Sequence, residues 1–279
     1  MYKDVLVPMM QAEGDLRGLQ RAAEYAAMLG AHLTALESVN LPVPSPGPWG
    51  IVPSSAMNEV YELLRSEARA RGERFRELLA GYDIRADVRI VESLFVNPDV
   101  TAAEHARYAD LSIVASPGAD SPELSVLRAY FSALLFGSGR PVLVVPEQWV
   151  HAPLRRAVIG WRPTRQAARA IHDALPLLHK AEQIDVVEVG PKGESLGDGD
   201  QPGADIAAHL ARHGLNVRVV VHEQHQEAVS SALLRHCEQA HAQLLVVGGY
   251  GHSRFREWAL GGTTRELLEF GNVPMFFSH

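Results

Sequence analysis

At 279 residues the chain is long enough for two ordinary domains, and 47% hydrophobic and 21% charged residues are typical of a folded protein rather than a disordered one. The formal charge is −7 at pH 7, with 13 basic and 19 acidic side chains in residues 1–150 and 13 and 14 in the remainder. Neither half therefore has the basic surface that nucleic acid or an anionic membrane requires. No apolar run approaches the roughly 20 residues of a spanning helix, and the first ten residues lack a signal-peptide core. Cys237 is the only cysteine, which excludes intrachain disulfides and cysteine clusters, so we expect a cytoplasmic protein that binds neither nucleic acid nor membrane.

The first half alternates short apolar runs with amphipathic stretches, a pattern that predicts strands and helices in turn. Five prolines between Asn40 and Ser55 exclude a helix or a central strand there, so we expect a loop. In chain order the predicted elements are strand Val5–Val7, a helix from Leu16 to Leu29 that Gly30 closes, strand His32–Val39, helix Met57–Leu79, strand Ala86–Val91, helix Asp99–Tyr108, strand Leu111–Val114, helix Leu124–Leu135 and strand Pro141–Val145.

The second half repeats this order, with a Gly/Asp-rich loop at Gly190–Gly203 in place of the proline-rich one. Its predicted elements are strand Ala157–Ile159, a helix from Thr164 to about Leu175 that Pro176 should interrupt, strand Ile184–Val189, helix Ala204–His213, strand Val217–Val221, helix Glu227–Ala240, strand Leu244–Val247, helix Thr263–Phe270 and strand Met275–Phe277.

The ends of the two halves superpose without a gap at an offset of 133 residues, which marks a duplicated unit. The matches are Leu111 with Leu244, Val114 with Val247, Gly118 with Gly251 and Pro141 with Pro274. Alternating strands and helices in each copy predict an α/β fold of two tandem, doubly wound domains with mainly parallel five-stranded sheets. We expect the domains at 1–147 and 154–279, with the boundary near Gln148–Leu154.

A glycine motif follows strand Leu244–Val247, where open α/β sheets bind ligands. Gly248-Gly249-Tyr250-Gly251 comes directly after the strand, and Gly261-Gly262-Thr263-Thr264 follows nine residues later at the start of the last predicted helix. Glycines let a backbone approach an anion, and a helix N-terminus offers free N–H donors. The alternative is that the glycines only form two tight turns, with Thr263 as a helix cap.

The motif and the repeated architecture resemble the universal stress protein family in its tandem two-domain form. That family has a Gly-x2-Gly-x9-Gly signature, which Gly248, Gly251 and Gly261 match in spacing. The resemblance implies the Rossmann-like fold of adenine-nucleotide alpha-hydrolases and a triphosphate held by the loops at Gly248–Gly251 and Gly261–Thr264. It further implies that strand ends flank the adenine, which adds Gly160, Trp161 and Val189 to the expected site. The expected cofactor is ATP, with no metal beyond the Mg²⁺ that would accompany it.

Several positions depart from the family pattern. Gly262 stands where the family has a Ser or Thr, and Arg162 stands where nucleotide-binding members have an acidic residue. In the first half, Ala115 replaces the first glycine, Met10 replaces the acidic residue, and Arg128-Ala129-Tyr130-Phe131 replaces Gly261-Gly262-Thr263-Thr264. These side chains should fill a phosphate cradle, so we expect the first half not to bind nucleotide.

Catalysis and metal binding are weaker alternatives. A literal G-x-S-x-G at Gly193–Gly197 lies in the Gly/Asp-rich loop, without the strand–turn–helix context of a nucleophile elbow. Eleven of the thirteen histidines follow residue 150, but no spacing fixes a third ligand beside pairs such as His209 and His213. We expect a regulatory, ATP-binding stress-response protein rather than a dedicated enzyme, with slow ATP hydrolysis left open. The alternative function is a nucleotide-free interaction protein that keeps a remnant of the motif.

Each half ends in a short apolar strand, Val142–Val145 and Met275–Phe277. An unpaired apolar edge favours association. The family resemblance implies that these last strands pair across a two-fold axis, either between the two halves or between chains. We therefore expect an intrachain pseudo-dimer of domains or a homodimer.

Overall fold

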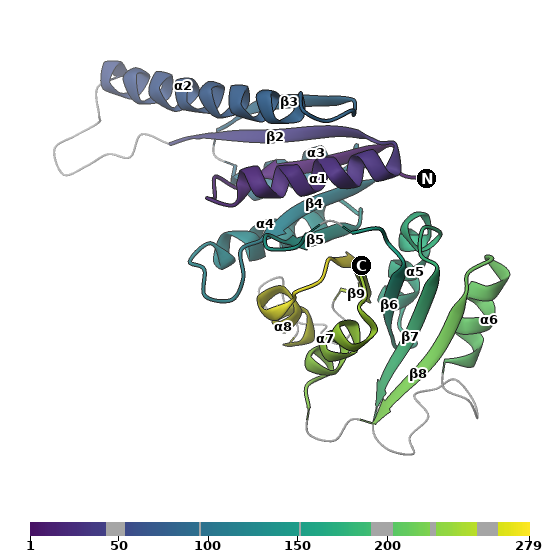
Figure 1. Cartoon of the computed structure of the whole chain (residues 1–279). Coiled ribbons are helices and arrows are strands. Elements are labelled where there is room, and N and C mark those ends of the chain that lie inside the picture. The colour runs from purple at the N-terminus through teal and green to yellow at the C-terminus, as the bar shows by residue number, and fades with distance from the viewer. Residues whose placement is uncertain (43–53, 95, 151, 191–202, 224–226, 250–261) are drawn as a thin grey trace. The chain divides into compact units, whose positions relative to one another are not determined.

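The computed structural model describes residues 1–42, 54–94, 96–150, 152–190, 203–223, 227–249 and 262–279. They form two compact units, an N-terminal unit of residues 1–114 and 125–140 and a C-terminal unit of residues 115–124 and 141–279. The predicted elements are present in their predicted order, and Figure 1 labels most of them along the chain. No helix in the described ranges is long and apolar enough to span a membrane.

The strands of the N-terminal unit lie in the order β3-β2-β1-β4 and are all parallel. Helices α1 and α2 pack on one another and on the sheet, with α2 over β2 and β3 (Figure 1). Buried Val39, Leu41 and Ala68 hold α2 against this edge. The bounds of these elements are β1 Asp4–Met9, α1 Asp15–Leu29, β2 His32–Leu41, α2 Ser54–Leu79, β3 Ala86–Leu94, α3 Pro98–Ala106, β4 Leu111–Ser116 and α4 Leu124–Gly137.

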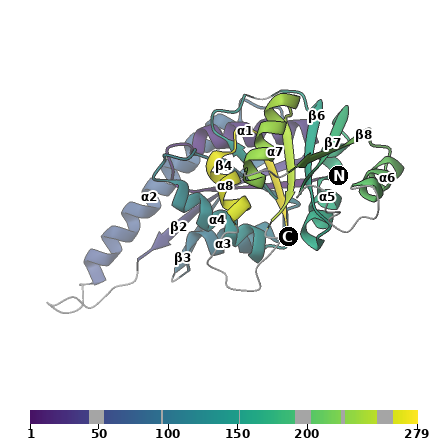
Figure 2. The same ribbon diagram turned by 90° about the horizontal axis from the view of Figure 1, so that it is seen from below.

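The C-terminal unit has the strand order β5-β10-β9-β6-β7-β8. Figure 2 shows α7 and α8 on one side of these strands and α5 and α6 on the other, the arrangement of a doubly wound sheet. The bounds are β5 Val142–Pro146, β6 Arg156–Trp161, α5 Arg165–Leu178, β7 Gln183–Gly190, α6 Ala204–Arg212, β8 Val217–Glu223, α7 Val229–Ala240, β9 Leu244–Gly248, α8 Gly262–Phe270 and β10 Met275–Ser278.

Strand β5 comes from the first sequence repeat but pairs with β10, the last strand of the second. The pairing is antiparallel and joins Met275 to Val144, Phe276 to Leu143 and Phe277 to Val142, whereas the other paired strands of this unit are parallel. The three paired residues on each of these two strands are all buried. This confirms the expectation that the last strands of the two halves pair with each other. The domain boundary near Gln148–Leu154 stays a prediction.

Helix α5 corrects one prediction. We expected Pro176 to interrupt it at about Leu175, but the helix continues to Leu178. Pro176 lies in the last turn, so the backbone hydrogen bond that its missing N–H removes lies near the end of the helix. Leu177 and Leu178 are both fully buried, so two further residues of helix gain apolar burial that offsets this cost.

Candidate functional site

The C-terminal unit has its topological switch point between β6 and β9. The chain leaves β6 through α5 toward β7 on one side, and it arrives at β9 on the other, so the helices that follow these strands diverge. The register pairs Gly160 of β6 with both Val187 of β7 and Val247 of β9. The strand ends Gly160-Trp161 and Gly248-Gly249 therefore lie next to one another, at the place where open α/β sheets bind ligands.

Packing requires the glycine at position 248 and favours the one at position 160. A Cβ atom on Gly248 would lie 2.5 Å from the backbone nitrogen of Ala167 and 2.6 Å from the carbonyl carbon of Gln166, in the first turn of α5. On Gly160 it would lie 2.9 Å from Val247 Cγ1 and 3.0 Å from Leu233 Cδ1. Gly248 thus lets α5 approach β9 closely, as in dinucleotide-binding folds.

The N-terminus of α8 is formed by the second part of the glycine motif. Gly262 and Thr263 are exposed and Thr264 is buried. No described residue lies within 4 Å of the position of a Cβ on Gly262, so a side chain fits there as far as these residues are concerned. The first N–H groups of a helix have no intrahelical acceptor, which makes this exposed end available to an anion. Gly251 and Gly261 lie outside the described residues, as does the G-x-S-x-G match.

Strand β10 is bonded to the start of the glycine loop. The backbone N–H of Gly249 donates to the Ser278 carbonyl at 2.8 Å, and a ring nitrogen of His279 lies 3.0 Å from the Gly249 carbonyl oxygen. The Ser278 hydroxyl in turn donates to Asp173 of α5 at 2.7 Å. Gly249 is therefore bonded to the end of β10, and Ser278 of β10 is bonded to α5, the helix that follows β6.

The other expected site residues lie close to these strand ends. Trp161, the last residue of β6, pairs in register with Glu188 of β7, which is buried. Val189 follows in β7 and is half-buried. Arg162 is exposed and comes directly after β6, where Thr164 caps α5 by accepting a hydrogen bond from the backbone N–H of Ala167 at 3.2 Å. The positive charge of Arg162 therefore lies at the edge of the candidate site.

Sequence reasoning treated the histidines of the second half as candidate metal ligands, but two of them belong to a hydrogen-bonded chain. A ring nitrogen of His236 lies 3.0 Å from the carboxylate of Asp185, and its other ring nitrogen lies 3.0 Å from Nε2 of His222. Arg218 donates to both oxygens of Asp185, at 3.1 and 2.7 Å. Within the described part of the chain, no group of three or more His, Cys, Asp or Glu residues could hold a metal ion.

This network shifts the pKa values of its members. Burial alone would raise the pKa of Asp185, but the hydrogen bonds from Arg218 and His236 outweigh it and lower that pKa. Burial, together with the neighbouring His236, lowers the pKa of His222. Burial also raises the pKa of the Cys237 thiol to about 12, so that this thiol stays protonated and unreactive.

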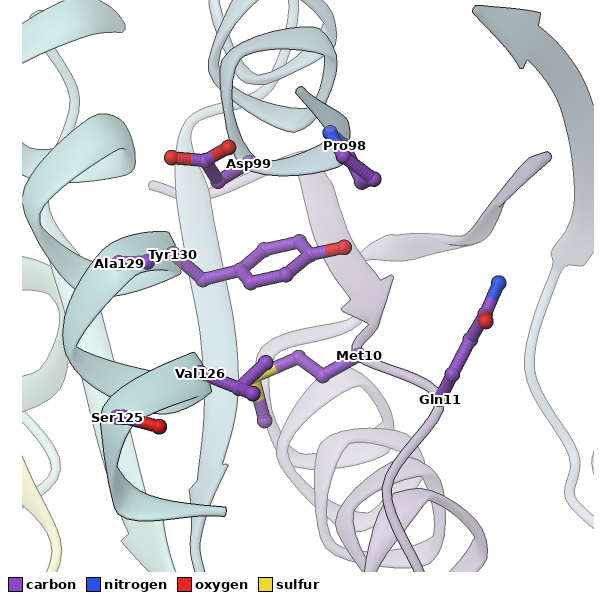
Figure 3. A pocket seen from close by; sticks show the side chains of 8 residues that line it. All are labelled: Met10, Gln11, Pro98, Asp99, Ser125, Val126, Ala129 and Tyr130. Atoms are coloured by element: carbon purple, nitrogen blue, oxygen red, sulfur yellow. The ribbon is translucent and has the colours of Figure 1, made fainter. Parts of the chain in front are cut away.

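The equivalent position in the N-terminal unit has no exposed glycine end. Phe131 is fully buried and Tyr130 is 6% exposed, so bulky side chains occupy the first turns of α4. A cavity of about 340 Å³ remains beside them, and Figure 3 shows Tyr130 reaching into it from α4. The expectation that this half does not bind nucleotide stays a prediction that agrees with these packed side chains.

Comparison with known proteins identifies the family. Residues 154–277 match the model of the Universal stress protein family. The second half of the chain therefore matches this family. The universal stress proteins Rv2005c of Mycobacterium tuberculosis and Mb2028c of Mycobacterium bovis are each 23% identical to it over 280 residues, which is 90% of this chain and 88% of each relative.

The fold of the family is also present in solved structures. A universal stress protein from Archaeoglobus fulgidus aligns with a TM-score of 0.72 over 99% of this chain and 95% of that chain, at 17% sequence identity. This likeness establishes the fold described above and confirms the α/β prediction. The ligand has to be argued from the residues of the site.

Proposed function

We propose that this protein binds an adenine nucleotide, with ATP as the expected ligand, in its C-terminal unit. The observation that carries the proposal is the meeting of β6 and β9 at the switch point, from which Gly248-Gly249 leads out of the sheet. The chain returns at the exposed N-terminus of α8, where Gly262 and Thr263 begin the helix. The spacing of the glycines supports the same ligand.

The residues of this site have separable roles in the proposal. The N–H groups at the start of α8 would bind phosphate oxygens, with the positive end of the helix dipole favouring negative charge. The Thr263 and Thr264 hydroxyls would add hydrogen bonds, and Mg²⁺ would accompany the phosphates. Trp161 and Val189, at the ends of β6 and β7, would flank the base together with Gly160.

We further propose that the bound nucleotide is a regulatory ligand. Gly249, directly after β9, is hydrogen-bonded to Ser278 and His279, and β10 is in turn paired with β5. A ligand that binds beside Gly249 would therefore stabilise the β5–β10 ladder. This coupling favours a signalling role, in an intrachain pseudo-dimer or a homodimer located in the cytoplasm.

Titration of the intact chain with ATP tests the proposal, by native mass spectrometry for stoichiometry and by calorimetry for affinity. We expect one ATP per chain. Gly262→Ser restores the hydroxyl that the family pattern has, in open space, and should tighten binding about two- to tenfold. Gly262→Glu puts a negative charge beside the phosphates and should weaken binding. Ala208→Glu, at an exposed position of α6, adds the same charge elsewhere and should have no effect.

Two results would count against nucleotide binding at this site. The absence of an adduct at millimolar ATP would favour the nucleotide-free interaction protein, and equal effects of Gly262→Glu and Ala208→Glu would place any bound ATP elsewhere. Arg162→Asp adds a further test, because it replaces the basic residue after β6 with the acidic type expected of nucleotide-binding members. Measurement of ADP release in the same samples decides whether ATP is hydrolysed.

A further inference from the structure

The cavity of the N-terminal unit lies where β1 ends and α3 and α4 begin. It measures about 340 Å³, at the lower end of the range of about 300–1,000 Å³ found for small-molecule pockets. Met10, Val126 and Ala129 give it apolar walls, while Asp99, Gln11 and Tyr130 contribute polar groups. In Figure 3 the Tyr130 ring extends between Asp99 and Pro98 of α3 on one side and Met10 on the other.

The Tyr130 hydroxyl points into this cavity. The residue is 6% exposed, and among the described residues its hydroxyl makes no hydrogen bond. The phenol oxygen is therefore open to a group that enters the cavity, and a phenol on a largely buried ring usually has a hydrogen-bond partner. Asp99, in the first turn of α3, likewise has no basic partner among the residues described. A ligand that donates to the Asp99 carboxylate and hydrogen-bonds to the phenol would satisfy both.

The charges around the cavity determine whether a positively or a negatively charged ligand is favoured. None of the described residues that line it is Lys or Arg. The Arg71 guanidinium of α2 is engaged at 2.6 Å by Glu37, which is fully buried. Burial raises the pKa of the Tyr130 phenol, and the carboxylates of Asp99, Asp15 and Glu37 raise it further. The field at the phenol is therefore negative, which disfavours phosphates and attracts cations.

We propose that this cavity binds a small organic ammonium ion. The ammonium group would lie between the Asp99 carboxylate and the Tyr130 ring, since a carboxylate and an aromatic face both attract a cation. The apolar part of the ligand would pack on Met10, Val126 and Ala129. This inference does not depend on ATP binding, which concerns the other unit.

The test compares three probes of similar shape and different charge with the intact chain. Calorimetric titration should show that pentylammonium binds with one site per chain, while 1-pentanol and hexanoate bind at least about tenfold more weakly. Asp99→Asn should weaken pentylammonium binding about tenfold and leave 1-pentanol binding unchanged. Tyr130→Phe, which removes only the hydroxyl, should weaken pentylammonium binding less. Glu104→Gln removes an exposed charge from the same helix outside the cavity and should have no effect.

Three results would overturn the proposal. One is no binding of pentylammonium up to about 10 mM, and another is equal binding of pentanol or hexanoate. The third is displacement of pentylammonium by ATP with wild-type efficiency in the Gly262→Glu variant, which would show that this cavity accepts a nucleotide. Thermal unfolding of each variant verifies the fold, and the comparison of probes on the wild type decides the case if Asp99→Asn does not fold.

Discussion

Replacement of Gly248 by alanine tests whether the first glycine of the motif serves packing as well as ligand binding. The added Cβ would lie 2.5 Å from the backbone nitrogen of Ala167, whereas ordinary contacts begin at 3.4 Å. The strand end or the first turn of α5 must therefore move by about 0.9 Å, the difference between these two distances. Backbone atoms cannot rotate away as a side chain can, and overpacking of this kind costs about 1–3 kcal/mol.

The matched control is Gly262→Ala, at the other end of the same motif. In the described part of the chain, no atom lies within 4 Å of its Cβ position. Alanine also restricts the unfolded chain more than glycine does. We expect its stability to be unchanged or raised by up to about 1 kcal/mol. Gly248→Ala should in contrast lower the free energy of unfolding, and with it the affinity for ATP, since the ends of β6 and β9 shift.

Urea unfolding followed by circular dichroism and tryptophan fluorescence measures both variants, because the midpoint reports stability when the slope is unchanged. The reasoning would be refuted if Gly248→Ala unfolded within about 0.5 kcal/mol of the wild type, the ordinary range of neutral surface substitutions. It would also fail if Gly262→Ala were destabilised to the same extent. Either result would mean that the close approach of α5 to β9 does not determine the residue at 248.

Three further predictions concern the C-terminal unit. Asp185→Asn removes the negative charge and replaces one of the two accepting oxygens with an NH2 group that cannot accept from Arg218 or His236. This should cost about 2–3 kcal/mol in urea unfolding, and a loss no larger than that of the exposed Glu238→Gln would contradict it. Because burial lowers the folded-state pKa of His222, the unfolded chain binds the proton more readily. This contribution to stability is then complete above a pH of about 6.5 and lost as the pH falls below it. His222→Gln should flatten the fall in Tm between pH 8 and pH 5, and an unchanged slope would exclude His222 as its source. Thr164→Ala removes the cap of α5 and should cost about 1 kcal/mol, whereas Thr164→Ser should restore stability; failure of the serine variant to do so would point to packing of the methyl group.

The architecture could be predicted because the sequence repeat gives the same order of strands and helices in both halves. The offset of 133 residues takes β4 at Leu111 to β9 at Leu244 and β5 at Val142 to β10 at Met275, so ambiguous short strands in one half are supported by the other. The extension of α5 past Pro176 was not predictable from local rules, since the burial of Leu177 and Leu178 depends on tertiary contacts. The register that places Gly160 beside Val247 likewise requires the sheet.

The polar residues of the site were harder to predict. Asp185 and Glu188 lie in the apolar run of β7, and a charge in such a run indicates a buried partner without saying which one. The partners of Asp185 come from β8 and α7, 33 and 51 residues away. Tyr130 was expected to block a phosphate site, and the cavity beside it arises from α3 and β1, whose approach no local pattern specifies.

The register of β5 and β10 has a consequence for how this chain arose. With the offset of 133, Leu143 and Phe276 are the same position of the repeat, and they face each other at the centre of the ladder. The contact is therefore isologous, the kind by which two copies of a one-repeat chain would associate through a single surface. Joining the copies makes the encounter intramolecular, so its effective concentration is set by the connecting chain and does not fall on dilution. Each strand then needs to fit only one partner, which allows a leucine on one side and a phenylalanine on the other.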